Sequence, residues 1–123
     1  MSGMSVTAVD DDPTQPSDDE MRARLAGAAE FTAVVLRRGP RYGEDGSDAV
    51  IWEHGRRNFR LREHGLLRIV CPVVDDTDVC GFGIFSATVD EVRQIMDADP
   101  GVDAEVFVYD VHPCRGFPGD QLG

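Results

Sequence analysis

The chain has 123 residues, and its 12 basic against 23 acidic side chains give a formal net charge of −11. A chain of this length predicts one domain, and its acidity argues against nucleic acid as the main partner, because phosphate binding needs a basic surface. No apolar run reaches the roughly 18–20 residues of a membrane span, and the acidic N-terminus carries no signal-peptide pattern. We therefore expect a cytoplasmic protein with no membrane partner.

Three cysteines occur in the chain, Cys71, Cys80 and Cys114. The odd count and the lack of CxxC spacing argue against a disulfide framework and against a zinc site. Cys71 and Cys80 flank a predicted hairpin and could face each other across two strands. We expect small buried thiols, because a reactive thiol would need an electropositive setting. The sequence has no phosphate-binding glycine loop, HExxH pair or GxSxG elbow, and we expect neither a metal nor a cofactor.

Residues 1–20 are predicted to form a disordered acidic tail. They hold six carboxylates, no Lys or Arg and few apolar side chains, so they cannot offset the entropy lost on ordering. An alternative stays open, because the Ser-x-x-Glu sequence at 17–20 has the form of a capping box. A short helix within residues 18–28 would then turn Met21 and Leu25 inward.

The rest of the chain, residues 29–123, is predicted to fold as one domain of alternating strands and helices. Strand segments are rich in β-branched and aromatic residues, and helical segments repeat apolar residues every three or four positions. In chain order we expect a strand at 31–38, a helix at 48–65, strands at 66–73 and 80–87, a helix from Thr88 to about Ala98, a strand at 104–111 and a turn-rich tail from His112 to Gly123. The first strand is nearly continuous in apolar residues and should be central, whereas Pro72 places the second at a sheet edge.

Local signals predict where the helices begin and end. Asp48 is a candidate N-cap of the first helix, and Gly65 is its candidate stop, because glycine adopts the left-handed conformation at low cost. Thr88 and Glu91 form a capping box that begins the second helix. The sequence Asp99–Pro100–Gly101 is expected to end it.

The order strand–helix–strand–strand–helix–strand predicts an α+β, ferredoxin-like βαββαβ fold. It consists of a four-stranded antiparallel sheet with two helices on one face. The other face would be apolar and open to water, which is unfavourable. Two such sheets packed face to face would bury both open faces, so we expect a two-fold homodimer.

One histidine lies on the inward stripe of the first helix. Ile51, His54, Asn58 and Leu61 are spaced by three or four residues and share one face, which should lie against the sheet. Antiparallel helices place the start of the first beside the end of the second, where Asp99 lies. Because a carboxylate that orients an imidazole suits proton transfer, His54 and Asp99 are the candidate catalytic residues. Two other interpretations stay open, a hydrogen-bonded core histidine and an aspartate that only ends a helix.

The remaining candidates have simpler explanations. His64 falls on the last turn of the first helix, where a histidine interacts favourably with the helix dipole at the surface. His112 precedes a proline at a strand end and is expected to be structural. The acidic stretch at 75–78 is expected to be a solvated hairpin turn, because it lacks the glycine-centred pattern of a calcium loop.

A set of short segments follows a definite order and spacing along the chain. They are FTAVVLRRGP, His54 followed eleven residues later by Gly65–Leu66–Leu67, a proline-ended strand, GFGIF, Asp97–Ala98–Asp99–Pro100, Val111–His112–Pro113 and Phe117–Pro118–Gly119–Asp120. Over about residues 31–120 the chain thereby resembles YCII-related proteins. The resemblance implies a small dimeric α/β barrel, and it places the family's candidate active-site histidine and aspartate on His54 and Asp99.

Two positions differ from the family pattern. Cys71 precedes Pro72 where the family usually has glycine, and Cys114 follows a His–Pro pair where it often has tryptophan. A chlorinated-hydroquinone dehydrochlorinase is similar to the family. The resemblance implies cofactor-independent isomerase, lyase or dehydrochlorinase-like chemistry on a small cyclic or phenolic organic molecule, performed by His54 and Asp99. The alternative is a non-catalytic ligand-binding or accessory protein on the same scaffold.

Overall fold

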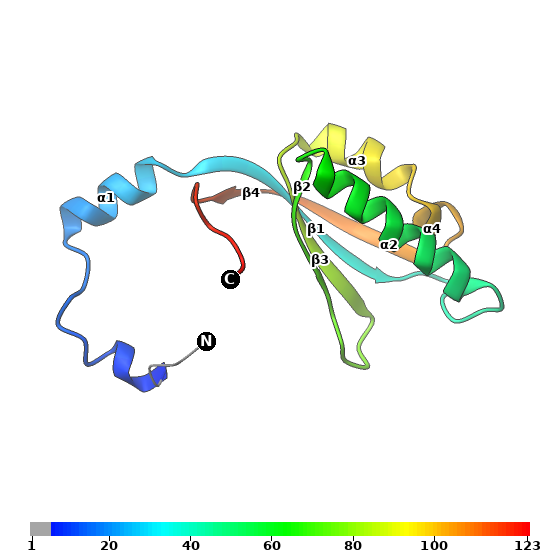
Figure 1. Ribbon diagram of the computed structural model, residues 1–123, viewed down its shortest axis with the longest axis horizontal. Helices are drawn as coiled ribbons and strands as arrows, with labels where there is room; N and C mark the ends of the chain where they lie inside the picture. Colours follow the sequence, from blue (N-terminus) through cyan, green and yellow to red (C-terminus); the bar gives the residue numbers. More distant parts are fainter. Residues whose placement is uncertain (1–5) are drawn as a thin grey trace.

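The computed structural model describes residues 6–123, and in it helices cover one face of a four-stranded antiparallel sheet (Figure 1). The strands are β1 (Ala29–Arg38), β2 (Leu67–Pro72), β3 (Val79–Phe85) and β4 (Phe107–Gly116), in the order β2-β3-β1-β4. The helices that cover the sheet are α2 (Ser47–Glu63), α3 (Val89–Asp97) and the short α4 (Pro100–Asp103). This α+β arrangement is compatible with the predicted ferredoxin-like fold.

Strand β1 lies in the interior of the sheet, as predicted. It pairs with β3 on one side and with β4 along all ten of its residues on the other. The prediction of an edge position for Pro72 is also confirmed, because β2 is a terminal strand of the sheet. Side chains alternate along β1: Thr32, Val34 and Leu36 are buried under the helices, and Ala33 and Val35 between them are half-buried on the other face.

The core lies between the sheet and the helices. Helix α3 contributes Val92, which is fully buried, and Met96. Its first turn is fixed by the predicted capping box, in which the Glu91 N–H donates to Thr88 Oγ1 and the Thr88 N–H donates to Glu91 Oε1. The buried apolar residues are Val34, Leu36, Leu67, Phe85, Val92, Met96, Val106 and Phe107.

Helix α2 begins differently from the prediction and ends as predicted. Its N-cap is Gly46 at φ 89°, which makes no side-chain capping bond, so Asp48 is not the cap. Ser47 is buried and donates to the carbonyl of Arg41, which moves the helix start one residue earlier. Asp48 therefore falls in the first turn, where its charge still favours the helix dipole. Gly65 adopts φ 75° immediately after the helix, as expected of a glycine stop.

The region after α3 departs most from the prediction. The segment that begins at Pro100 forms helix α4, so the following strand starts at Phe107, not at residue 104. It then continues to Gly116 through residues that were predicted to be a turn-rich tail. Pro113 is tolerated there because β4 is an edge strand, and the long pairing with β1 holds the segment extended.

The N-terminal region contains a 3₁₀ turn, η1 (Val6–Val9), and helix α1 (Asp18–Ala26). The helix corresponds to the short helix that the sequence left open, and the Ser17 hydroxyl accepts from the Glu20 N–H at 3.2 Å. The part of the predicted disordered tail at residues 1–5 lies outside the described residues.

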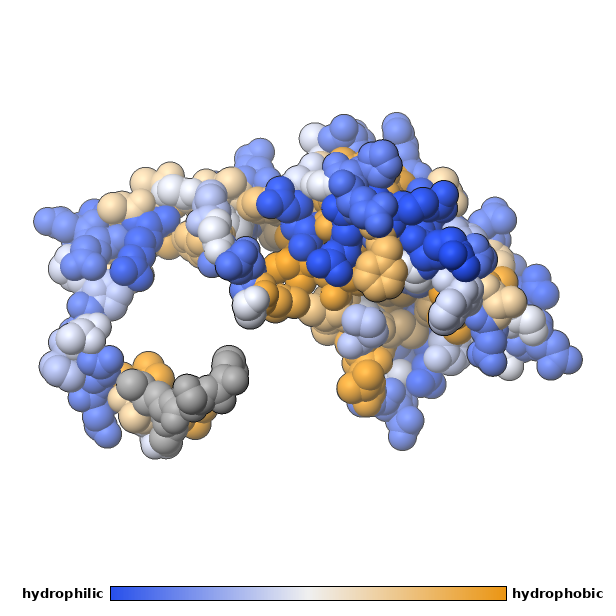
Figure 2. Space-filling model, viewed as in Figure 1, coloured by the Kyte–Doolittle hydropathy of each residue, from blue (hydrophilic) through white to orange (hydrophobic). Residues whose placement is uncertain are grey.

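The expected inward packing of α1 is wrong. Met21 and Leu25 are both exposed, and the helix has no buried residue. Figure 1 shows the reason, because α1 stands beyond the end of the sheet, away from α2 and α3. In the space-filling view α1 extends away from the body of the sheet and the helices that cover it (Figure 2).

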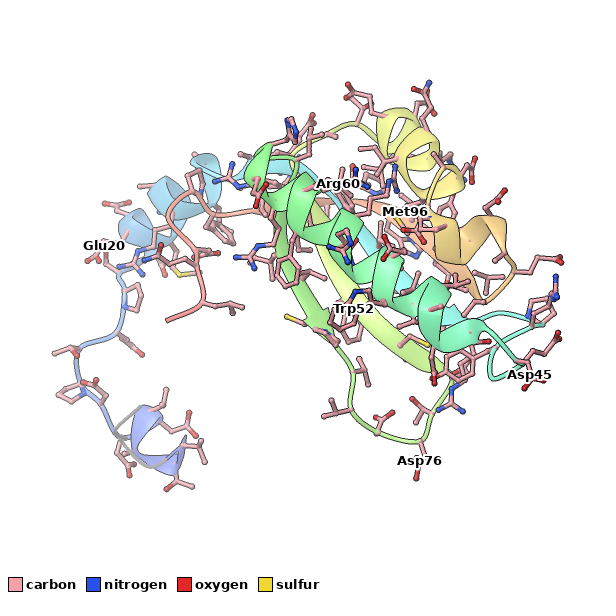
Figure 3. All side chains as sticks on the ribbon, turned by 45° about the vertical axis from the view of Figure 1, so that its right-hand side comes forward. Glu20, Asp45, Trp52, Arg60, Asp76 and Met96 are labelled. Carbon is pink, nitrogen blue, oxygen red and sulfur yellow. The ribbon has the colours of Figure 1, made fainter. Side chains whose placement is uncertain are left out.

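The outer surface of the helix layer and the loops beside it carry many charged side chains, together with the exposed aromatic residues Trp52 and Phe59 of α2. Figure 3 shows Asp45 in the loop before α2 and Asp76 in the loop between β2 and β3. Arg60 lies on α2 and is exposed, as is Trp52. In Figure 2 hydrophobic atoms gather below this hydrophilic cap.

Candidate active site

The side chains of His54 and Asp99 meet between α2 and the start of α4. His54 Nδ1 lies 2.9 Å from both Oδ1 and Oδ2 of Asp99. Both residues are buried, with 9% of His54 and 1% of Asp99 exposed. The topology argument, which placed the start of the first long helix beside the end of the second, thus predicted the contact between these two side chains.

Asp99 does more than end a helix, because it is the N-cap of α4. Its Oδ2 accepts hydrogen bonds from the backbone N–H groups of Gly101 at 2.9 Å and Val102 at 3.2 Å. Pro100 occupies the first turn, where its missing N–H leaves no donor unsatisfied. Arg57 adds a positive charge, with Nη1 at 3.7 Å from Asp99 Oδ1. The orientation of the carboxylate is therefore fixed by backbone N–H groups of α4 as well as by the histidine.

These contacts keep Asp99 ionised. Burial raises the pKa of a carboxyl group, but the hydrogen bond from His54, the positive charge that this ring carries when it is protonated and the N–H groups of Val102 and Gly101 together lower the pKa of Asp99 below its ordinary value. An ionised carboxylate can only accept hydrogen bonds. His54 Nδ1 must therefore carry a hydrogen and donate a hydrogen bond to Asp99.

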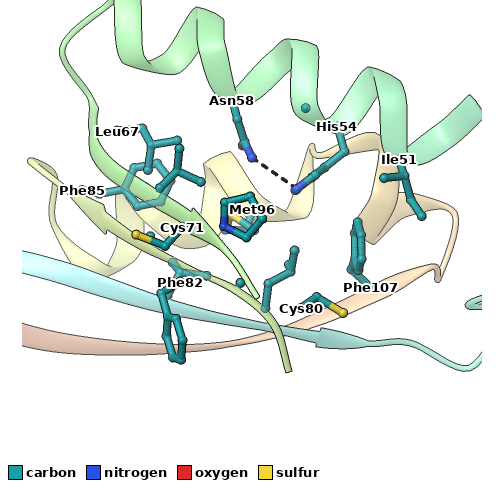
Figure 4. Close-up of a pocket in the computed structure, with 17 residues that line it drawn as sticks. Ile51, His54, Asn58, Leu67, Cys71, Cys80, Phe82, Phe85, Met96 and Phe107 are labelled. Carbon is teal, nitrogen blue, oxygen red and sulfur yellow. Dashed lines mark hydrogen bonds between the residues drawn. The ribbon is translucent and has the colours of Figure 1, made fainter. Parts of the chain in front are cut away.

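The other ring nitrogen of His54 faces Asn58. The two residues are one helical turn apart on α2, and Asn58 Nδ2 lies 3.2 Å from His54 Nε2, the dashed contact in Figure 4. The ring of Phe107 packs on the imidazole with its centroid at 4.8 Å. With Nδ1 protonated, the neutral imidazole has its lone pair on Nε2, so the amide N–H of Asn58 is the donor.

His54 and Asn58 line a pocket of about 230 Å³ between α2 and the sheet (Figure 4). Its walls come from α2, β1, β2 and β3, with Met96 and Phe107 behind. Among the described residues, none of the side chains that line it is Lys, Arg, Asp or Glu. The lining residues are Val34, Leu36, Ile51, His54, Gly55, Asn58, Leu67, Val70, Cys71, Pro72, Cys80, Gly81, Phe82, Gly83, Phe85, Met96 and Phe107.

The cysteines of the β2–β3 hairpin also lie at this pocket. Cys71 and Cys80 both line it as free thiols, and burial raises the pKa of Cys80. They are half-buried and not fully buried as expected, and they do not lie opposite each other, because Cys71 pairs with Phe82. The hairpin register therefore places the two cysteines at different positions along the hairpin.

The remaining candidate residues lie elsewhere. His64 is exposed at the C-cap of α2, and His112 is exposed on β4. Asp75 accepts from the backbone and hydroxyl of Thr77, which lowers the pKa of Asp75. Across residues 6–123 no cluster of three or more His, Cys, Asp or Glu side chains is placed to hold a metal ion.

Two residues near the candidate pair were not identified from the sequence. Asn58 was placed on the inward stripe without a role, although a polar side chain four residues after a histidine on the same helix is within reach of it. Arg57 donates to the Ile95 carbonyl at 2.7 Å and so links α2 to α3 beside Asp99. No local pattern predicts that contact.

The scan against protein-family models found no match to this chain, and neither did the search of curated proteins. In the portion that the structure describes, no helix has the length and apolar character needed to cross a membrane.

Proposed function

We propose that this chain is a small-molecule-binding, YCII-like protein that catalyses a cofactor-independent proton transfer with His54 and Asp99. Asp99 orients the ring and stabilises the imidazolium, and His54 Nε2 takes and returns the proton. The reaction class is isomerisation or elimination, as in an isomerase, a lyase or a dehydrochlorinase. The substrate is a small organic molecule.

The observation that supports this proposal is the contact of His54 Nδ1 with both oxygens of Asp99 at 2.9 Å, beside a pocket that His54 itself lines. A buried carboxylate with three further donors or charges around it is held in one orientation, so the ring is held as well. The unprotonated nitrogen is then the one available for chemistry. The pocket supplies an apolar surface next to it.

The experiment is a deuterium wash-in assay in D₂O with small cyclic ketones, lactones and halogenated phenols, followed by proton NMR. We expect His54→Ala and Asp99→Asn to lower exchange or turnover by roughly 10²–10⁴-fold. His64→Ala is the matched control, because it removes an exposed histidine from the end of the same helix. Unchanged turnover in both site variants would remove the catalytic proposal.

A non-catalytic ligand-binding protein is the second candidate. The observation that favours it is the contact between Asn58 Nδ2 and His54 Nε2, which occupies the lone pair that a base would use. In that case His54→Ala would weaken ligand binding, and no molecule in the panel would exchange deuterium above the rate of buffer.

We also propose that the protein is a homodimer that packs through the sheet face opposite the helices. Support comes from apolar side chains on that face, which include Phe82 and Val108, 49% and 45% exposed. Light scattering at micromolar concentration should give twice the chain mass of 13.5 kDa. A monomer mass would contradict this part of the proposal without affecting the His54–Asp99 pair.

A further inference from the structure

Asn58 lies where a ligand in the pocket would approach Nε2 of His54. Its amide lies 3.2 Å from Nε2 and lines the same pocket. The other ring nitrogen is held by Asp99. A ligand that gives a proton to Nε2 must therefore displace the amide N–H of Asn58 from the lone pair.

A displaced amide N–H needs a new acceptor. Asn58 is half-buried, and an N–H that loses its protein acceptor there weakens binding unless the ligand replaces it, so the productive ligand is one that brings an acceptor beside its acidic hydrogen. A carbonyl oxygen next to the acidic atom meets this need. The oxygen accepts from the Asn58 N–H, and the acidic hydrogen lies against His54 Nε2, so both partners of the lost Asn58–His54 contact are paired again. The Asn58 N–H then lies where negative charge develops when the proton leaves.

The pocket also limits the charge and size of the ligand. Its described lining contains no Lys, Arg, Asp or Glu side chain that could pair with a charged group, and an unpaired charge in an apolar pocket is strongly disfavoured. Its volume of about 230 Å³ is below the ~300–1,000 Å³ of pockets for drug-sized ligands. The ligand is therefore neutral and small.

From these three observations we propose that Asn58 is the oxyanion donor of the site, and that the site takes small neutral carbonyl compounds with an acidic hydrogen on the adjacent atom. This inference rests on the proposed function and extends it. Asn58 is then a catalytic residue, because its amide contacts the substrate oxygen.

The step balances without a further reactant. The bond from the α-carbon to hydrogen breaks, and the proton goes to His54 Nε2, whose charge Asp99 stabilises. The electron pair of that bond forms a carbon–carbon double bond, and the carbonyl π pair moves to oxygen, which accepts from Asn58 Nδ2. The imidazolium then returns the proton to another carbon, or to a group that leaves from the β-carbon.

The test uses 2-pyridone, a neutral single ring with an N–H donor next to a carbonyl acceptor, and N-methyl-2-pyridone, which lacks the donor. Binding is measured by NMR titration of the full chain. We expect the Asn58 side-chain amide signals of the wild type to shift with 2-pyridone and not with its N-methyl form. This measurement needs no variant, so it stands even if a variant folds poorly.

Asn58→Leu should weaken 2-pyridone binding by roughly 3- to 10-fold, the effect of one neutral hydrogen bond, and should leave the weak binding of N-methyl-2-pyridone unchanged. A merely structural role for Asn58 would weaken both ligands equally and would overturn the inference. Arg60→Gln is the matched control, because it changes an exposed side chain two residues further along α2. It should bind both ligands like the wild type.

His54→Ala separates this inference from the proposed function. If His54→Ala loses 2-pyridone binding while Asn58→Leu keeps it, Asn58 is not the oxyanion donor and the His54–Asp99 proposal survives. If both variants bind like the wild type, both proposals fail. A wild-type protein that does not bind 2-pyridone at millimolar concentration would overturn the ligand class.

Discussion

The two faces of the sheet differ although the same strands build both. On the face under the helices, Val34 and Phe85 are 4% and 2% exposed, and the candidate pair lies above them. On the other face, Val35 is half-buried and Phe82 is 49% exposed. In Figure 4 the Phe85 ring lies on the α2 side of the sheet, and the Phe82 ring points away from it.

Alternation along a strand decides on which face of the sheet each side chain lies. Whether the apolar side chains of a face form a core and a pocket depends on the layer that covers that face. Under α2 and α3 the apolar side chains form a packed core and a pocket with a fixed histidine. On the open face comparable side chains form no site within the described chain. A second copy on that face would make the two sides alike in burial, while the chemistry would stay on the helical side.

The largest expected effect compares two phenylalanines on β3. Phe85→Ala should lower the free energy of unfolding by about 3–5 kcal/mol, because it removes a fully packed ring from the core. Phe82→Ala should lower it by less than half as much in dilute protein, because half of that ring is in water. Urea unfolding of both variants measures the difference. Equal losses at the lowest protein concentration would show that the open face is covered within one chain.

The sequence predicted the covered face well because its signals are local. The apolar run that predicted β1 and the T-x-x-E capping box of α3 each depend on residues a few positions apart. The pairing of His54 with Asp99 followed from the antiparallel helices and needed no contact information. Topology alone brought together Asp99, just after the end of α3, and His54, about two turns into α2.

The features that the sequence analysis missed depend on contacts from distant parts of the chain, or on a local sequence that fits two structures. Asp99–Pro100–Gly101 fits both a helix stop and the N-cap of a new helix, and a four-residue helix has no periodicity to reveal it. Residues 112–116 look turn-rich, yet they are extended because β1 pairs with them from far away in the chain. Asn58 has a partner on its own helix, but its role depends on which nitrogen of His54 faces the pocket.

The second prediction compares two carboxylates near the end of α3. Asp99→Ala should lower the unfolding free energy by roughly 2–3 kcal/mol, because it removes an N-cap and leaves His54 without its partner. Asp97→Ala, the control, removes an exposed acceptor of the Tyr109 hydroxyl and should cost at most about 1 kcal/mol. Chemical unfolding at pH 7 measures both.

The stability difference between the wild type and Asp99→Ala should also depend on pH. The pKa of Asp99 in the folded protein lies below the ~3.9 of an unfolded aspartate, so its stabilising contribution is complete above about pH 4 and is lost as the pH falls through the folded value. The stability difference between the wild type and Asp99→Ala should therefore shrink as the pH is lowered below 4. A difference that stays constant down to pH 2 would contradict the ionised state assigned to Asp99.

The third prediction uses neighbours on β1. Val34→Ala should lower the unfolding free energy by about 2 kcal/mol through lost burial of two methyl groups. Val35→Ala should change it by less than about 0.5 kcal/mol in dilute protein, and by more at higher concentration, because a dimer links stability to concentration. Melting temperatures across a concentration series test this. A Val35→Ala effect that does not grow with concentration would count against packing through the open face.

The smallest effect concerns the turn that leads from α4 into the covered face. Glu105 has φ 60°, the positive value that non-glycine residues rarely adopt, and it directly precedes the buried Val106 and Phe107. Asparagine tolerates this conformation better, so Glu105→Asn should raise the unfolding free energy by about 0.5 kcal/mol. Asp103→Asn removes a carboxylate from the same short segment without a positive φ and is the control. An equal gain in unfolding free energy in both variants would mean that the loss of negative charge is responsible. The positive φ of Glu105 would then cost the turn no measurable stability.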